Sequence, residues 1–532
     1  MNILKRWILY PFLLGAYPVL ALLANNLGQI IGPIYAVRPL LFALVLAGLF
    51  LLIFWLFLRD WSRSALAATL TLLLFFLYGH VFNVISQVQI AGIVISRNRY
   101  LVTLWVILLA AGLWWIARKV KTPQAWTLPL NSVSLALVVF FLIQITFFEM
   151  RSSNLMQQLQ MTGSGSVASQ LHPPAGKTLP DIYYIVPEDY TRADGLKQSY
   201  SYDNSAFLAA LQQKGFYPIN CSLSNYVFSN MSIAAAFNMQ YLDTLSSRFS
   251  PPNTDQDDLD PYLDNNAVRQ TLKDLGYKFI SFQSGYTPTE FRDADVYLSP
   301  QTDIQNLQLF GGLTPFEALL FQTTALDALY NSHVFPRALD NTLFSAAYLL
   351  DRNRILYELN KLPEIATSIP GPKFVFVHML GPHNPFVFGP NGEILTRNYP
   401  FTLNDDLDAM NFNDYTAGYT GEITYLNSRM LDDVSRILAT SATPPIIIIQ
   451  SDTGSTRIGE WVNTNLAAIY FPGAGRQNLY PSLSQVNTFR VVFNTYFGGH
   501  LDLLKDQTCS TGDHDPYRCT LKPEPDPACA KP

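Results

Sequence analysis

The sequence predicts a membrane anchor of five helices followed by an α/β domain with a mostly parallel central sheet. Two observations lead to this fold class. The first is composition: 49% of the residues are hydrophobic and only 14% are charged, whereas soluble proteins carry about 25% charged residues. The second is distribution, because the long apolar runs fall in the first 150 residues and strand and helix signals alternate after residue 180. The chain therefore joins a membrane part to a water-soluble part.

Five apolar runs in the first 150 residues have the length of membrane-spanning helices. A helix of about 20 residues crosses a hydrocarbon core of about 30 Å. Buried helices of a soluble protein are the alternative, but these runs leave no room for polar faces. A cleaved signal peptide would explain only the first run, and no small-residue cleavage site follows it. The runs cover residues 7–25, 39–58, 65–86, 100–117 and 131–149.

Positive charges in the short loops predict the orientation of this anchor. Seven lysines and arginines fall on the side of the N-terminus and three on the other side. Loops rich in Lys and Arg stay in the cytoplasm, so the N-terminus is expected inside. Five crossings of the cytoplasmic (inner) membrane then place everything after residue 150 outside the cytoplasm. The seven are Lys5, Arg6, Arg59, Arg63, Arg118, Lys119 and Lys121, and the three are Arg38, Arg97 and Arg99.

All four cysteines lie after the last apolar run, in the part predicted to be outside the cytoplasm. Three of them fall in the last 25 residues, a stretch too polar to hold itself by core packing. Disulfides stabilise such segments in oxidising compartments. We expect a Cys509–Cys519 bond, which leaves Cys221 and Cys529 as the second pair. A metal cluster is the alternative, although the sequence contains no CxxC pair.

Beyond the anchor, residues 151–180 are rich in Gly, Ser, Gln and Pro and have the composition of a linker. Residues 181–505 alternate short apolar runs with helical patterns, which indicates a mostly parallel sheet covered on both faces. Residues 506–532 form the cysteine-containing tail. The expected strands cover 181–186, 277–282, 373–379, 445–449 and 466–471, and the clearest helices cover 204–216 and 420–438.

Polar residues follow three of the expected strands. Glu188 comes after the first, His378 and His383 mark the end of the third, and Asp452 follows the fourth. Ligands of parallel α/β sheets bind beyond the carboxyl ends of the strands. We therefore expect these side chains to form one site.

The tetrapeptide "DTGS" at 452–455 also matches the signature of aspartic proteases. Their mechanism requires two carboxylates that share a proton. The chain has no second Asp-Thr-Gly or Asp-Ser-Gly, and the flanking pattern alternates strand and helix. The protease is therefore the weaker interpretation.

Several sequence blocks, taken in order, resemble the sulfatase-like branch of the alkaline phosphatase superfamily. The sequence looks especially like membrane-anchored envelope enzymes related to lipoteichoic acid synthase, which share a five-helix anchor and an outer catalytic domain. The resemblance covers roughly residues 179–505. The blocks are "LPDIYYIVPEDYTRADGL" (179–196), "DNSAFLAALQQKGFY" (203–217), "SNYVFSNMSIAAAFNMQYL" (224–242), "FVFVHMLGPHNPFVF" (374–388) and "IIIIQSDTGS" (446–455).

The resemblance implies a role for each matching residue. Glu188 corresponds to the first acidic metal ligand, and Asp452 to the Asp of an Asp-His ligand pair. Ser229 stands where relatives carry a nucleophilic Thr that also binds the metal; its alternative role is the N-cap of a helix beginning near Met231. His383 corresponds to the substrate-binding histidine, and His378 is a second candidate for that role. No C/S-x-P-x-R stretch supports formylglycine, so sulfate-ester hydrolysis is disfavoured.

Two positions depart from the family pattern. Thr453 stands where relatives have the histidine of the Asp-His pair, and Asp189 replaces a small neighbour and is an alternative ligand to Glu188. A set made of Glu188, Ser229, Asp452 and Thr453 offers only oxygen atoms. Such a set favours Mn²⁺ or Mg²⁺ over Zn²⁺.

The resemblance implies an extracytoplasmic enzyme that transfers or hydrolyses a phospho-substituent on an envelope lipid or glycan. The membrane anchor would hold its site near a lipid-linked donor. The Thr453 departure supports an alternative, a metal-poor pseudoenzyme that binds envelope polymer or partner proteins. No basic tract indicates a nucleic-acid partner. The oligomeric state is open.

Overall fold

The chain forms two compact units in the computed structural model, one built mainly from apolar helices and one around a β-sheet. The first comprises Met1–Arg151, Asp303–Ala347 and Arg397–Asn404, and the second comprises Ser152–Thr302, Tyr348–Thr396 and Asp405–Pro532. The structure describes all residues except 1–3, 5–6, 31–32, 86–88, 91–92, 95–97, 163–164, 177, 301–311, 332–336, 396–400, 402–409, 456, 458–460, 513–514, 523–527 and 530–532.

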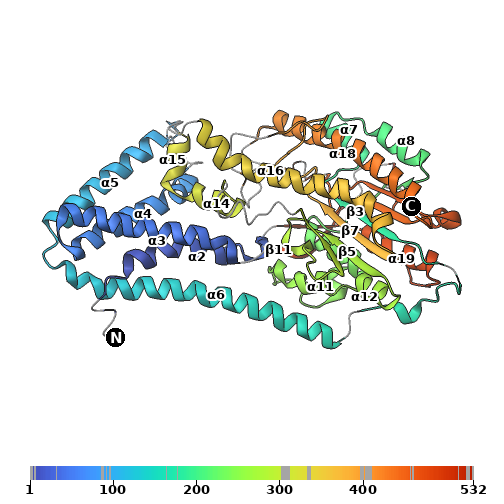
Figure 1. The fold of residues 1–532 in the computed structure, drawn as a ribbon, viewed down its shortest axis with the longest axis horizontal. Helices are drawn as coiled ribbons and strands as arrows, with labels where there is room; N and C mark the ends of the chain where they lie inside the picture. The colour runs from blue at the N-terminus through green and yellow to red at the C-terminus, as the bar shows by residue number, and fades with distance from the viewer. Residues whose placement is uncertain are drawn as a thin grey trace. The chain divides into compact units, whose positions relative to one another are not determined.

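Among the described residues of the helical unit, four segments are long and apolar enough to cross a membrane: Pro33–Leu58, Trp61–Ile85, Asn98–Arg118 and Pro123–Phe148. The first predicted run forms a shorter helix of 16 residues. A predominantly apolar, multi-helix N-terminal part is therefore confirmed. Figure 1 shows these helices packed along one another. They are α2 (Tyr10–Asn25), α3 (Val37–Leu58), α4 (Trp61–Ile85), α5 (Asn98–Arg118) and α6 (Thr127–Thr162), and α14 (Pro315–Thr323) and α15 (Ala325–Asn331) join them.

The short helices α14 and α15 come from the middle of the chain and pack against α4. Phe316 and Leu320 of α14 lie in the same apolar cluster as Leu72 of α4. Gly79 of α4 permits this close approach, because a Cβ atom there would lie 2.0 Å from the carbonyl oxygen of Gln322. The sequence analysis places this interval in the outer domain, whereas its packing is with the apolar helices.

The second unit is built on a seven-stranded sheet with the order β4-β9-β8-β3-β7-β5-β6. The strands from β8 to β6 are parallel, while β9 runs antiparallel to β8 and β4 antiparallel to β9. The predicted mostly parallel sheet is confirmed. Its strands are β3 (Ile182–Pro187), β4 (Tyr217–Pro218), β5 (Lys278–Phe282), β6 (Val296–Leu298), β7 (Lys373–Met379), β8 (Ile446–Gln450) and β9 (Ala467–Tyr470).

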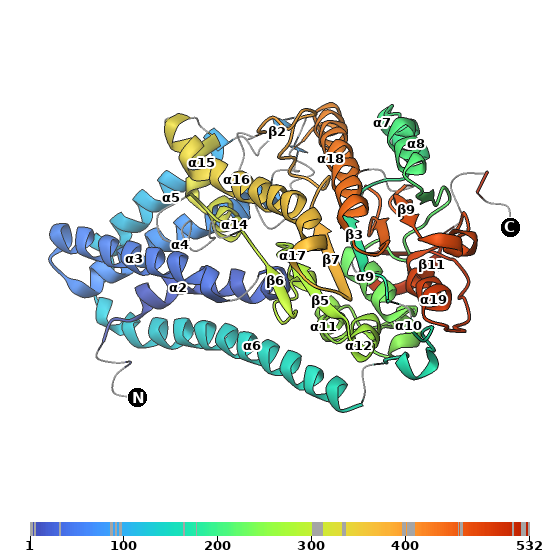
Figure 2. The ribbon, with the colours of Figure 1, turned by 45° about the vertical axis from the view of Figure 1, so that its right-hand side comes forward.

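Helices accompany this sheet, as Figure 2 shows for α9, α18 and α19. The long α18 lies beside β3 and β7 in both ribbon views. Its buried residues Ile423, Leu426, Met430, Val434 and Ile437 recur at helical spacing. The longer helices of this unit are α7 (Ala193–Tyr200), α8 (Ser205–Gln213), α9 (Ser229–Asn238), α12 (Ala267–Asp274), α18 (Phe412–Thr440) and α19 (Gln485–Tyr496), together with the part of α16 (Arg337–Lys361) from Tyr348 onward.

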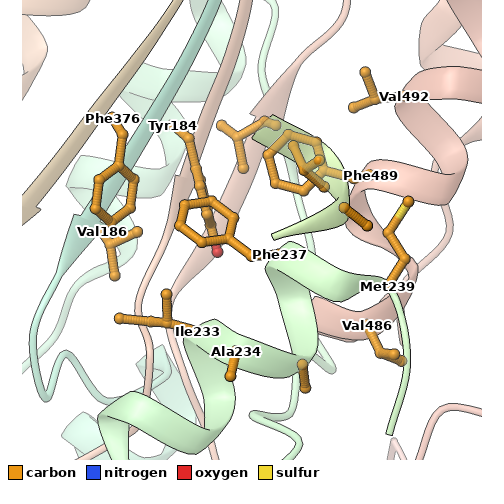
Figure 3. Packing of buried hydrophobic residues seen from close by; sticks show 14 of the residues in the cluster. Tyr184, Val186, Ile233, Ala234, Phe237, Met239, Phe376, Val486, Phe489 and Val492 are labelled. Carbon is orange, nitrogen blue, oxygen red and sulfur yellow. The ribbon is translucent and has the colours of Figure 1, made fainter. Parts of the chain in front are cut away.

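One face of the sheet packs on α9 and α19. Tyr184 of β3 and Phe376 of β7 contact Phe237 of α9, and Phe489 of α19 stacks edge-on against Tyr184. Figure 3 shows these rings interdigitating. Because side chains alternate along a strand, the even-numbered residues of β3 and β7 face α9.

The polar C-terminal segment is held by disulfides. Cys509 bonds to Cys519, and Cys221 bonds to Cys529. These are the two pairs that the sequence analysis favours. The first pair joins β10 (Cys509–Gly512) to β11 (Asp515–Leu521), an antiparallel hairpin separate from the main sheet.

Candidate active site

Three polar side chains meet at the carboxyl ends of the parallel strands because the strands that carry them are neighbours. β3 lies between β7 and β8, and the register pairs Val186 with His378. Glu188 directly follows β3, His378 is the penultimate residue of β7, and Asp452 lies two residues beyond β8. One potential ligand atom from each of these three residues lies within 4.8 Å of the others. The sheet therefore gathers two carboxylates and an imidazole at one point.

All three side chains are buried, with 7% of Glu188, 1% of His378 and none of Asp452 exposed. His378 Nε2 lies 3.8 Å from Glu188 Oε2. Within the described part of the chain, neither His378 Nε2 nor Asp452 Oδ2 has a hydrogen-bond partner. Burying carboxylates beside an unpaired ring nitrogen is costly unless a cation joins them. The donor set therefore fits a divalent metal ion.

Ser229 completes this group from the helix on the same side of the sheet. It is the first residue of α9, and its hydroxyl donates to Glu188 Oε1 over 3.2 Å. Phe228 occupies the N-cap position, without a side-chain cap. The alternative role of Ser229 as an N-cap is therefore not what the helix shows. The N-terminus of α9 also favours a bound anion, because the helix dipole is positive there.

The electrostatics of the site follow from its burial. Burial raises the pKa of the Asp452 carboxyl, an effect opposed by the Ser229 hydroxyl and by backbone N–H groups that include that of Asp189. Burial, together with the positive charge of Arg354, lowers the pKa of His378 to about 3. His378 is therefore neutral and carries a lone pair on one ring nitrogen, as a metal ligand must.

Asp189, Thr453 and His383 form a second, adjacent group. The Thr453 hydroxyl donates to Asp189 Oδ1 over 2.7 Å, and His383 Nε2 lies 3.7 Å from Asp189 Oδ2. Asp189 has a left-handed backbone with φ of 56°, and its N–H donates to Asp452 Oδ1 over 3.1 Å. Asp189 thus holds Thr453 and Asp452 through hydrogen bonds and lies beside the His383 ring.

Two of these residues lie in groups other than the ones expected from the sequence. From the sequence, Thr453 is expected among the metal ligands and His378 among the substrate-binding residues. In the structure His378 lies with Glu188 and Asp452, whereas the Thr453 hydroxyl is engaged by Asp189. The signal that indicates His378 is the strand periodicity, since it shares the face of Phe376, which packs on α9.

The chain is similar in structure to several proteins of known structure. One is the integral membrane protein lipooligosaccharide phosphoethanolamine transferase A (EptA) from Neisseria meningitidis, at 15% identity and a TM-score of 0.40 over 93% of this chain and 95% of that chain. A second is the C-terminal periplasmic domain of EcEptC from Escherichia coli in complex with Zn, at 13% identity and a TM-score of 0.38 over 62% and 85%.

A third is the lipoteichoic acid synthase LtaP from Listeria monocytogenes, at 12% identity and a TM-score of 0.35 over 66% of this chain and 78% of that chain. No family model matches the chain, and no curated protein matches it. What the chain does must therefore be argued from the chemistry of its own site.

Proposed function

We propose that the chain is a membrane-anchored enzyme that transfers or hydrolyses a phospho-substituent on an envelope lipid or glycan. The observation that carries this proposal is the Ser229 hydroxyl, held 3.2 Å from Glu188 at the start of α9, beside buried His378 and Asp452. A hydroxyl nucleophile, a group of metal-ligand type and a helix N-terminus converge there. Together they suit attack on a phosphorus centre.

In this proposal Glu188, His378 and Asp452 hold a divalent ion together with Ser229. When bound, such an ion lowers the pKa of a hydroxyl ligand and stabilises charge on phosphoryl oxygens. Ser229 attacks phosphorus as the bond from phosphorus to the leaving-group oxygen breaks, and its proton passes toward Glu188 Oε1, the acceptor of its hydrogen bond. Attack of an acceptor hydroxyl or of water on phosphorus then breaks the bond to Ser229 and restores the enzyme. The positive end of the α9 dipole stabilises the charge on the phosphoryl oxygens. His383, which is 19% exposed, binds the phosphoryl group or protonates the leaving group.

The imidazole changes the expected choice of metal. An all-oxygen set favours Mg²⁺ or Mn²⁺, but one nitrogen with carboxylate and hydroxyl oxygens suits Zn²⁺ or Mn²⁺ better than Mg²⁺. We therefore propose Zn²⁺ or Mn²⁺ as the resident ion. Metal analysis of the purified protein decides between them.

The proposal also places the second unit outside the cytoplasm. The loop charges of the anchor predict this orientation. Two disulfides support it independently, because such bonds persist in oxidising compartments. Protease added to intact spheroplasts is expected to cleave the second unit, and protection of that unit would contradict the orientation.

The test of the enzyme uses the full chain in detergent, loaded with Zn²⁺ or Mn²⁺, and a generic phosphodiester such as bis(p-nitrophenyl) phosphate. Ser229→Ala should lower the turnover rate at least ~100-fold, because it removes the nucleophile. Ser232→Ala is the matched control: Ser232 lies one turn further along α9, and its hydroxyl donates to the backbone of Tyr226. Activity that survives Ser229→Ala would refute the assignment of the nucleophile.

The second candidate function is a binding protein without catalysis, which the loss of the expected histidine at Thr453 favours. It predicts that neither Zn²⁺ nor Mn²⁺ binds at micromolar concentration and that no phosphodiester is cleaved. His378 beside Glu188 and Asp452 argues against it, since a site released from metal binding has no need to keep three buried ligands together.

A further inference from the structure

We propose that a chain of hydrogen bonds through the buried hydroxyls of Thr289 and Ser284 to the Glu290 carboxylate sets the tautomer and orientation of His378. The inference rests on the proposed function, which makes His378 a metal ligand. These three hydrogen-bonded residues lie in the loop that follows β5, the strand next to β7. Thr289 and Ser284 are fully buried. They do not touch the proposed metal position and act through His378, so they are positioning residues.

Continuous hydrogen bonds connect His378 to a carboxylate. His378 Nδ1 lies 2.8 Å from Thr289 Oγ1. The Thr289 hydroxyl lies 3.0 Å from Ser284 Oγ, and the Ser284 hydroxyl lies 3.2 Å from Glu290 Oε2. The ring of Tyr286 packs edge-on against the His378 ring, with centroids 5.7 Å apart, and limits its rotation. The hydrogen bond to Thr289 and the ring of Tyr286 thus constrain both the hydrogen bonding and the plane of the imidazole.

The direction of this hydrogen-bond chain follows from its far end. Glu290 Oε2 also accepts from the N–H groups of Ser284, over 3.1 Å, and Gly285, over 3.0 Å, so it acts as an acceptor toward this loop. The carbonyl oxygen of Tyr286, 3.1 Å from Ser284 Oγ and 3.3 Å from Thr289 Oγ1, is also only an acceptor. Both hydroxyl protons therefore point away from His378.

With its own proton directed away, Thr289 Oγ1 presents a lone pair to the ring, and His378 Nδ1 must donate to it. Neutral imidazole carries one proton, so Nε2 is left with a lone pair that faces Glu188 and Asp452. The opposite tautomer would point an N–H into the place of the cation. A ligand histidine whose second nitrogen donates to an oxygen is held in this way, and loss of the partner costs ~10–100-fold in metal affinity.

The test compares three variants of the full-length protein in detergent. Thr289→Val removes the hydroxyl and keeps the shape, and Thr289→Ser restores the hydroxyl. Thr287→Val is the matched control, because Thr287 lies in the same 3₁₀ turn and its buried Oγ1 has no hydrogen-bond partner among the described residues. The first readout is the dissociation constant for Zn²⁺ and Mn²⁺ by competition with a chelating dye. The second is the ¹⁵N NMR spectrum of histidine-labelled, metal-free protein, with the His378 signals assigned by comparison with His378→Gln.

Wild type, Thr289→Ser and Thr287→Val should bind metal equally and show a protonated Nδ1 at His378. Thr289→Val should bind ~10–100-fold more weakly and show a mixture of tautomers. If Thr289→Val binds metal like wild type and keeps the Nδ1–H tautomer, the positioning role is wrong and the proposed enzyme stands. If wild type binds neither metal, the proposed function fails. The NMR spectrum of the metal-free protein still decides the hydrogen-bond chain in that case.

Discussion

Asp433 on α18 is predicted to destabilise the folded protein above neutral pH. Its side chain is 1% exposed, and neither carboxylate oxygen has a hydrogen-bond partner in the described part of the chain. Burial raises the pKa of Asp433 from 3.8 to about 7, although Arg429 opposes the rise. An isolated carboxylate in such surroundings disfavours its charged form.

The magnitude follows from linkage between protonation and folding. A carboxyl whose folded pKa is raised imposes no penalty below its unfolded pKa, and the penalty is complete above its folded pKa. For Asp433 the loss of stability therefore develops between pH 3.8 and about 7. At ~1.4 kcal/mol per pKa unit, it is on the order of 4 kcal/mol.

Asp433→Asn removes this titration while keeping the shape of the side chain. The free energy of unfolding of the variant minus that of wild type should rise by on the order of 4 kcal/mol between pH 4 and pH 8. Hydrogen exchange of α18 peptides, measured by mass spectrometry on the intact protein in detergent, reports this difference. The cost of burying the Asn amide does not depend on pH. It therefore cancels when the difference in unfolding free energy at pH 8 is compared with the difference at pH 4.

Asp432→Asn is the matched control for this experiment, because its side chain is 61% exposed and its only described ion pair, with Arg436, is 3.9 Å long. Its effect should stay within ~0.5 kcal/mol at both pH values. If Asp433→Asn instead gives the same difference at pH 4 and pH 8, the folded protein does not raise the pKa of Asp433, and the reasoning from burial is refuted.

Two further predictions concern packing and cross-links. Gly79→Ala should destabilise the helical unit by ~1–3 kcal/mol, because its Cβ would meet the Gln322 carbonyl, whereas Gly48→Ala, with its nearest atom at 3.7 Å, should be neutral or stabilising; equal melting temperatures of the two variants would contradict this. In the chain-entropy account, Cys529→Ser opens a loop of 308 residues and Cys509→Ser one of 10 residues, so Cys529→Ser should cost ~3 kcal/mol more in unfolding free energy. Equal losses in denaturant titrations would count against that account.

The sequence was a good guide to elements whose signal is local. Continuous apolar runs predicted the long helices of the anchor and the five central strands, because burial on both faces requires such runs. The edge strands β4 and β6, with two and three residues, were not predicted. Strands this short carry too little periodicity to be distinguished from loops.

The packing of α14 could not be predicted for a different reason. "PFEALLFQT" reads as an ordinary apolar helix with a capping box, and the structure shows both features. Its contacts, however, are with α4, more than 200 residues earlier in the chain. The hydrophobic effect favours the burial of apolar residues but does not specify which surface buries them. The packing partner of α14 is therefore determined by tertiary structure alone.

Strand periodicity explains why the proposed ligands converge. Tyr184, Phe376 and Ile448 belong to the apolar cluster that packs on α9 and α19, so the even-numbered positions of three neighbouring strands face these helices. When this alternation is continued to the ends of the strands, the even-numbered positions are Glu188, His378 and Asp452. These residues lie together at the start of α9.

Thr453 shows what position-by-position comparison leaves out. The sequence resemblance predicts a histidine at this position. Thr453 is, however, one residue out of phase with Asp452, and its hydroxyl donates to Asp189, which is likewise one residue out of phase with Glu188. A metal ion requires a donor of suitable chemistry at a point in space, whichever strand supplies it. In a parallel sheet that point is reached from several strands. The proposed site therefore takes its imidazole from β7, where His378 stands in phase with the other ligands and has its own hydrogen-bonded support.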